Sequence, residues 1–94
     1  MVNQDTIGTP QAGKALTVAY TATAGTTTAL VASSVVRVMT TTDAFIEIGL
    51  NPTAAVNTGT YLPAYSPEYF QCPPGSKVSA VQVANGGTLY ITPF

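Results

Sequence analysis

The chain contains no histidine and no tryptophan, and Cys72 is its single cysteine in 94 residues. Without histidine it lacks the commonest general base, the commonest zinc ligand and every histidine-based catalytic triad. One cysteine and four carboxylates scattered along the chain do not form a zinc cluster either. Cys72 lies between Phe70 and Pro73, where a small buried hydrophobic side chain is a better prediction than a nucleophile. We therefore expect a protein that is not an enzyme, with no catalytic residues, cofactor, metal site or small-molecule substrate.

The short polar motifs of the chain predict turns and not active sites. Ser66-Pro67-Glu68 lacks the G-x-S-x-G context of a hydrolase nucleophile. Gly86-Gly87 falls between two predicted strands and opens no helix, so it is not a phosphate-binding loop. Asp43 lies in a predicted turn and Glu47 is expected to pair with Arg37, so the two carboxylates do not predict a glycosidase.

Charged side chains are rare, at 7% of residues against about 25% in an ordinary globular domain. The full set is Lys14, Arg37, Lys77, Asp5, Asp43, Glu47 and Glu68, with a net charge of −1. Three basic residues are too few to neutralise the phosphates of a nucleic acid, so we expect no nucleic-acid partner. So little charge, together with sixteen threonines, indicates a surface covered by other protein, because interface cores are depleted in charge. The alternative is a small secreted or robust β-domain with a hydroxyl-rich surface.

Targeting signals are also missing from the sequence. No apolar run approaches the roughly 18 residues of a membrane span, so we expect no membrane partner. The stretch Met1–Pro10 lacks the basic and apolar regions of a signal peptide, and we expect none. A lone cysteine forms no internal disulfide, which favours synthesis in a reducing cytoplasm.

The stretch from Val35 to Asn51 is the strongest structural signal in the chain. Two mainly β-branched runs alternate apolar and polar residues on either side of Thr41-Thr42-Asp43. This pattern predicts a β-hairpin with one buried face. The register that follows pairs Thr40 with Ala44, Val38 with Ile46, Val36 with Ile48, and Arg37 with Glu47.

The predicted pair Arg37–Glu47 lies on the outer face of this hairpin. Opposite charges directly across two strands contribute about 0.2–1 kcal/mol and help to fix the register. A slip of one residue would place the apolar side chains on opposite faces, so this register is the self-consistent one.

The rest of the chain predicts further short strands separated by turns. Residues 1–14 show no periodicity and predict an irregular N-terminal arm, whereas residues 15–94 predict a single domain. Alternation predicts strands at 15–21, 27–32, 59–64, 67–72, 77–84 and 88–92, in addition to the two strands of the hairpin.

A second hairpin is predicted around Asn85-Gly86-Gly87, because asparagine and glycine tolerate the left-handed conformations of a tight loop. Its register places Val83 opposite Leu89 and Val81 opposite Ile91. No segment shows helical periodicity. Seven or eight short strands without a helix predict an all-β fold, an antiparallel β-sandwich or small barrel of jelly-roll-like form, with the sandwich preferred.

Aromatic residues are concentrated in one stretch, where Tyr61, Tyr65, Tyr69 and Phe70 fall within ten residues. As a functional group they predict a sugar-stacking platform or a contact patch, but core and rim side chains of a sandwich are the preferred interpretation. The final Phe94 is expected to pack on its own domain, with insertion into a neighbour as the alternative. The candidate interaction residues are therefore Arg37, Glu47, Tyr61, Tyr65, Tyr69 and Phe94.

The second half of the chain carries a longer pattern of motifs. It runs from V-R-V-M-T-T-T-D-A-F-I-E-I-G-L-N-P-T-A through Y-L-P-A-Y-S-P-E-Y-F-Q-C-P-P-G-S-K-V-S-A-V-Q to G-G-T-L-Y-I-T-P-F. In the order of these motifs, residues 35–94 resemble small virion proteins of tailed bacteriophages. The positions that carry the resemblance are Arg37, Gly49, Asn51, Pro52, Pro63, Glu68, Pro74, Gly75, Gly86, Gly87 and Thr88.

The resemblance implies a structural role in a virion. It indicates a capsid decoration (cement) protein, a class with jelly-roll and related β-folds, that binds the major capsid protein lattice as a homo-oligomer, dimer or trimer. Such a protein is expected on the capsid surface after synthesis in the host bacterial cytoplasm. One alternative is a receptor- or carbohydrate-binding module of a head or tail fibre, and another is a head–tail connector or tail component.

Overall fold

The computed structural model describes residues 15–28 and 35–94, and within these ranges its regular elements are all β-strands. The predicted arm at residues 1–14 lies outside the described residues. The strands are β1 (Leu16–Tyr20), β2 (Gly25–Thr26), β3 (Val35–Thr40), β4 (Ala44–Gly49), β5 (Thr60–Leu62), β6 (Glu68–Gln71), β7 (Lys77–Gln82) and β8 (Gly87–Pro93).

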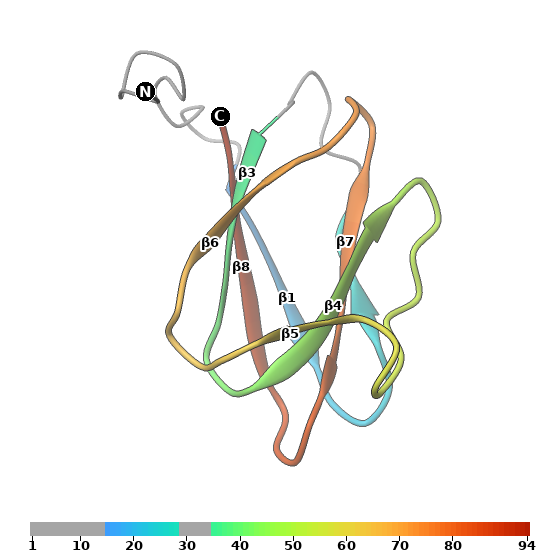
Figure 1. The fold of residues 1–94 in the computed structure, drawn as a ribbon, viewed down its shortest axis with the longest axis vertical. Helices are drawn as coiled ribbons and strands as arrows, with labels where there is room; N and C mark the ends of the chain where they lie inside the picture. Colours follow the sequence, from blue (N-terminus) through green and yellow to red (C-terminus); the bar gives the residue numbers. More distant parts are fainter. Residues whose placement is uncertain (1–14, 29–34) are drawn as a thin grey trace.

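The strands form two four-stranded sheets in which every pair of neighbours is antiparallel (Figure 1). Sheet A has the order β1-β8-β3-β6, and sheet B has the order β2-β7-β4-β5. The predicted all-β antiparallel sandwich is thereby confirmed. The strand order is compatible with the jelly-roll connectivity that the sequence predicts, a double Greek key.

A single hydrophobic core lies between the sheets. Period-two alternation turns the apolar residues of β3 and β8 in sheet A, and of β4 and β7 in sheet B, toward the same interior. Each aliphatic side chain that is fully buried contributes about 1.5–3 kcal/mol relative to exposure. The core residues are Tyr20, Val36, Val38, Ala44, Ile46, Leu62, Cys72, Val78, Ala80, Leu89 and Ile91.

The predicted hairpin at Val35–Asn51 is wrong, because β3 and β4 belong to different sheets. β3 pairs with β8 and β6, so Val38 lies opposite Ile91. β4 pairs with β7 and β5, so Ile46 lies opposite Ala80. The segment Thr41–Asp43 therefore forms an arch that carries the chain from one sheet to the other.

The predicted hairpin around Asn85-Gly86-Gly87 is wrong for the same reason. β7 lies in sheet B and β8 in sheet A, so Val81 pairs with Phe45 and Ile91 pairs with Leu16 and Val38. In a hairpin and in an arch alike, the apolar sides of both strands face the core. Alternation therefore shows which residues are buried without showing which strands are neighbours.

The short strand predicted at residues 27–32 is also displaced. The structure places β2 at Gly25–Thr26, and Thr27 and Thr28 follow it as irregular chain. Residues 29–32 lie outside the described part. A Cβ on Gly25 would overlap the carbonyl oxygen of Ala19, so the glycine that seemed to break the pattern permits a close approach of two chain segments.

Tyr20 joins the two arches at one end of the sandwich. Its ring is 2% exposed, and its hydroxyl donates to the Thr42 carbonyl oxygen at 2.9 Å and lies 2.8 Å from Thr42 Oγ1. Thr42 Oγ1 in turn donates to the Asn85 carbonyl oxygen at 2.9 Å. In a hairpin loop Thr42→Asp would be nearly silent, whereas here aspartate lacks the hydroxyl that donates to the Asn85 carbonyl oxygen.

The loop between β4 and β5 covers the outer face of sheet B. Pro52 and Ala54 are buried in it, and the Ala54 amide donates to Ser79 Oγ at 2.9 Å. Ser79 and Val81 are consequently buried, although both point away from the core on β7. A Cβ on Gly59 would lie 2.6 Å from the Ile46 carbonyl oxygen, so glycine allows the end of this loop to approach β4 closely.

Candidate interaction surfaces

The structure separates Arg37 and Glu47, which the sequence predicts to be partners. Arg37 lies on β3 with Tyr69 opposite on one side and Thr92 on the other. Glu47 lies on β4 opposite Ser79 and is exposed. Since each alternates with inward-facing neighbours, Arg37 belongs to the outer face of sheet A and Glu47 to the outer face of sheet B. The predicted cross-strand ion pair is wrong.

The outer face of sheet A carries a group of large side chains around Arg37. Tyr69 is 51% exposed and Tyr90 is 42% exposed, whereas Met39 is half-buried. Their strand neighbours Val38, Phe70 and Leu89 point inward, which fixes the outward direction of this group. We call this surface the aromatic face and define it by Arg37, Met39, Tyr69, Tyr90, Thr92 and Phe94.

Phe94 completes the aromatic face by folding back onto its own sheet. Its backbone amide donates to the Val35 carbonyl oxygen at 2.8 Å. Its ring lies 5.6 Å from that of Tyr69, with an angle of 58° between the planes. Offset or tilted aromatic pairs of this kind add about 0.5–1.5 kcal/mol beyond their buried area. Phe94 therefore packs within its own chain, as the preferred interpretation of the sequence has it.

Tyr61 and Tyr69 lie on opposite sides of the sandwich. Leu62 points into the core, so its neighbour Tyr61 points outward from sheet B, where its ring meets Phe45 edge-on at 5.7 Å. A hydrogen bond to the Asp43 carboxylate, with a smaller contribution from burial, raises the pKa of Tyr61 above its ordinary value.

Tyr65 lies between these two tyrosines, in the connection from β5 to β6. It has a positive φ of 56°, is 67% exposed, and donates its amide to the Thr40 carbonyl oxygen at 2.8 Å. The three tyrosines therefore occupy two faces and a connection, and they do not form one stacking platform.

Asp43 has a structural role at the first arch. Its Oδ1 accepts a hydrogen bond from the Ala64 amide at 2.9 Å, and its carbonyl oxygen accepts one from the Val83 amide at 3.2 Å. The residue thus holds together the first arch, the β5–β6 connection and the chain that follows β7.

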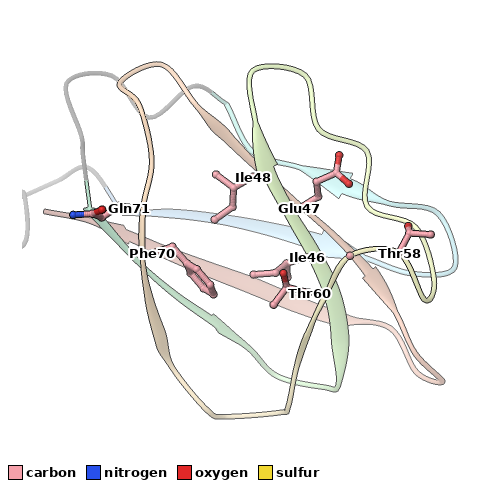
Figure 2. Close-up of a pocket in the computed structure, with 8 residues that line it drawn as sticks. Ile46, Glu47, Ile48, Thr58, Thr60, Phe70 and Gln71 are labelled. Carbon is pink, nitrogen blue, oxygen red and sulfur yellow. The ribbon is translucent and has the colours of Figure 1, made fainter.

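A hollow of about 340 Å3 opens at the side of the sandwich, between β4 and β6. Figure 2 shows Ile46 and Ile48 of β4 and Phe70 of β6 pointing toward the space between the strands. β5 pairs with β4 only from Ala44 to Ile46. The rest of β4 therefore has no β5 partner along the edge where the hollow lies. The lining combines these three apolar side chains with polar residues, and Glu47 is the only charged residue among those that line the hollow.

Cys72 is a buried free thiol at the edge of the core. Burial raises the pKa of the Cys72 thiol, and a hydrogen bond with Ser76 opposes this effect in part. The prediction of a buried hydrophobic side chain is confirmed. Within residues 15–28 and 35–94, no three His, Cys, Asp or Glu side chains gather as metal ligands. In the same ranges there is no helix long and apolar enough to cross a membrane.

Sequence reasoning missed Met39 and Tyr90 as members of a shared surface. Alternation places each on the outer side of its strand, but only the pairing of β3 with β8 brings the two residues opposite each other. Comparisons with protein-family models, curated proteins and solved structures found no match.

Proposed function

We propose that this protein is a structural virion protein of a tailed bacteriophage, a capsid decoration protein that binds the major capsid protein lattice. The observation that carries the proposal is the aromatic face, which presents half-exposed tyrosines around a single cation. Interface cores are enriched in tyrosine, methionine and arginine and depleted in lysine and carboxylates. The resemblance of residues 35–94 to tailed-phage virion proteins supports the major capsid protein as the partner.

The difference between the two sheets supports a docking role for sheet A. The β4–β5 loop covers sheet B, so that Ser79 and Val81 on its central strand are 0% and 3% exposed. Tyr90, on a central strand of sheet A, is 42% exposed. The chain therefore covers the outward side of the central strand β7 in sheet B, whereas the outward side of the central strand β8 in sheet A keeps a half-exposed tyrosine.

Modest affinity per copy is sufficient for such a protein. Copies joined as a dimer or trimer on a repeating lattice bind together, and their avidity exceeds the affinity of each contact. A chain with few charges also loses little free energy to charge desolvation when it docks.

Counting copies in the particle tests the proposal. Quantitative mass spectrometry of virions from the phage that encodes this chain should find it at hundreds of copies, in proportion to the major capsid protein. A dozen copies or fewer would contradict a decoration role and favour the connector or tail alternative.

The carbohydrate-binding alternative receives less support from the structure. Its candidate surface requires Tyr61, Tyr65 and Tyr69 together, whereas Tyr61 and Tyr69 lie on outer faces of different sheets. A glycan array and phage adsorption to host cells distinguish this alternative from the proposed function.

A further inference from the structure

We infer that the aromatic face docks onto a different protein through an acidic side chain of that protein, which pairs with Arg37 between the Tyr69–Phe94 ring pair and Tyr90. The inference rests on the proposed function only for the identity of the partner as the major capsid protein. The face, the chemistry of the contact and the exclusion of a second copy follow from the structure itself.

The register of sheet A places Arg37 at the centre of the aromatic face. Along β3, Val35 lies beside the backbone of Phe94, Arg37 lies opposite Tyr69 and Thr92, and Met39 lies opposite Tyr90. An incoming side chain therefore meets one half-buried guanidinium flanked by aromatic rings. This arrangement matches the arginine and tyrosine clusters that dominate binding energy in protein interfaces.

The described acidic side chains lie away from this surface. Glu47 is on the outer face of sheet B, and Asp43 is bound to the Ala64 amide at the first arch. Glu68 alternates with Tyr69, so it points to the other side of β6. A guanidinium desolvated by docking therefore requires an acidic partner from outside the described residues.

A second copy of the chain is a poor occupant for this face. Because Arg37 lies at the centre of the aromatic face, a two-fold axis through that centre brings Arg37 of one copy close to Arg37 of the other. Juxtaposed like charges cost several kcal/mol in a buried interface. The occupant is therefore a different polypeptide with an aspartate or glutamate at the contact.

Site-specific photo-crosslinking tests which face docks. A benzophenone amino acid replaces Tyr90 in one variant and Tyr61 in a control, two exposed tyrosines on opposite outer faces. Both variants are expressed during infection, and the crosslinked peptides are sequenced by mass spectrometry. We expect position 90 to crosslink to a different protein, in a peptide that contains an aspartate or glutamate, and position 61 to give no such product.

Charge reversal tests the role of Arg37. Arg37→Glu and Lys77→Glu change the net charge equally. Lys77 is the control because it precedes inward-facing Val78 on β7 and therefore lies on the outer face of sheet B. In a sedimentation assay with the crosslinked partner, Arg37→Glu should weaken binding by on the order of tenfold or more, and Lys77→Glu should leave it unchanged. Unchanged melting temperatures of both variants show that the folds are intact. Equal losses in the two variants would overturn the inference.

The crosslinks also separate this inference from the proposed function. Products from position 90 to a second copy, or to residues 1–14 of the same chain, overturn the docking inference. A product from position 90 to a protein other than the major capsid protein supports the docking face and contradicts the capsid role. A capsid crosslink from position 61 alone contradicts the docking face and leaves the capsid role standing.

Discussion

Two buried threonines of this protein differ in whether their hydroxyl groups find a partner. Thr27 Oγ1 accepts a hydrogen bond from the Val78 amide at 3.0 Å. Thr40 is 0% exposed, and its Oγ1 has no hydrogen-bond partner among the described residues. Burying a polar group costs free energy because the group loses its hydration. A hydrogen bond inside the protein offsets this cost, and a group without a partner leaves it uncompensated.

Thr40→Val should therefore stabilise the protein by about 1 kcal/mol, because valine has nearly the same shape and no hydroxyl. Thr27→Val is the matched control and should destabilise by about 1–3 kcal/mol, because it leaves the Val78 amide unsatisfied. Urea denaturation of the three proteins measures both changes. A loss of stability in both variants would show that Thr40 Oγ1 is satisfied in solution.

Ile46 is a core residue that sheet B contributes. It is 1% exposed and packs within the single hydrophobic cluster. Ile46→Asp buries an unpaired carboxylate, which costs several kcal/mol and should unfold the domain. Thr53→Asp, at an exposed loop position, should stay within about 0.5 kcal/mol of the parent. Circular dichroism during thermal unfolding distinguishes the two, and similar behaviour would mean that Ile46 is not in the core.

At the scale of the elements, Tyr20 holds the two arches in place. Its hydroxyl donates to the Thr42 carbonyl oxygen at 2.9 Å and accepts from the Thr42 amide at 3.3 Å. Tyr20→Phe removes these bonds and keeps the ring, so we expect a loss of about 1–3 kcal/mol. A double-mutant cycle with Thr42→Val should give a coupling energy of about 0.5–3 kcal/mol. Additive effects in urea denaturation would show that Tyr20 and Thr42 stabilise the fold independently of each other.

The strands were largely predictable from the sequence, but their partners were not. The alternation around Val38 and Ile46 correctly identifies both residues as buried. It does not show that they face each other from different sheets, because a short polar segment serves equally as a hairpin loop or as an arch. Strand neighbours here come from distant segments, such as β3 with β8, and a local pattern holds no information on such pairings.

The aromatic face was predictable only in part for the same reason. Arg37, Tyr69 and Phe94 stood out as candidates from their residue types. Met39 and Tyr90 join them only through the register of β3 with β8, which no local pattern reveals. Glu47 was predicted beside Arg37, and Tyr61 was grouped with Tyr69, but Glu47 and Tyr61 belong to the other sheet.

For the whole molecule, the two outer faces of the sandwich differ in how far the chain covers them with its own loops. Ser79 Oγ accepts from the Ala54 amide at 2.9 Å and fixes the β4–β5 loop over sheet B. Sheet A has no such cover among the described residues, and its large side chains stay half-exposed. A small domain gains stability from added buried surface, so a partner on sheet A would benefit the fold as well as the assembly.

The position of β8 has a consequence for how the protein is made. Among the described strands, β8 is the only one that pairs with β1, and it follows the other seven along the chain. On the ribosome, β1 therefore waits without a partner until almost the whole described sequence has been synthesised. Sheets built from such distant pairings fold slowly, because the entropy cost of closing long loops comes before the contacts that offset it. Sheet A is thus completed only after β8 has been synthesised, and until then an unpaired strand edge is exposed to other nascent chains.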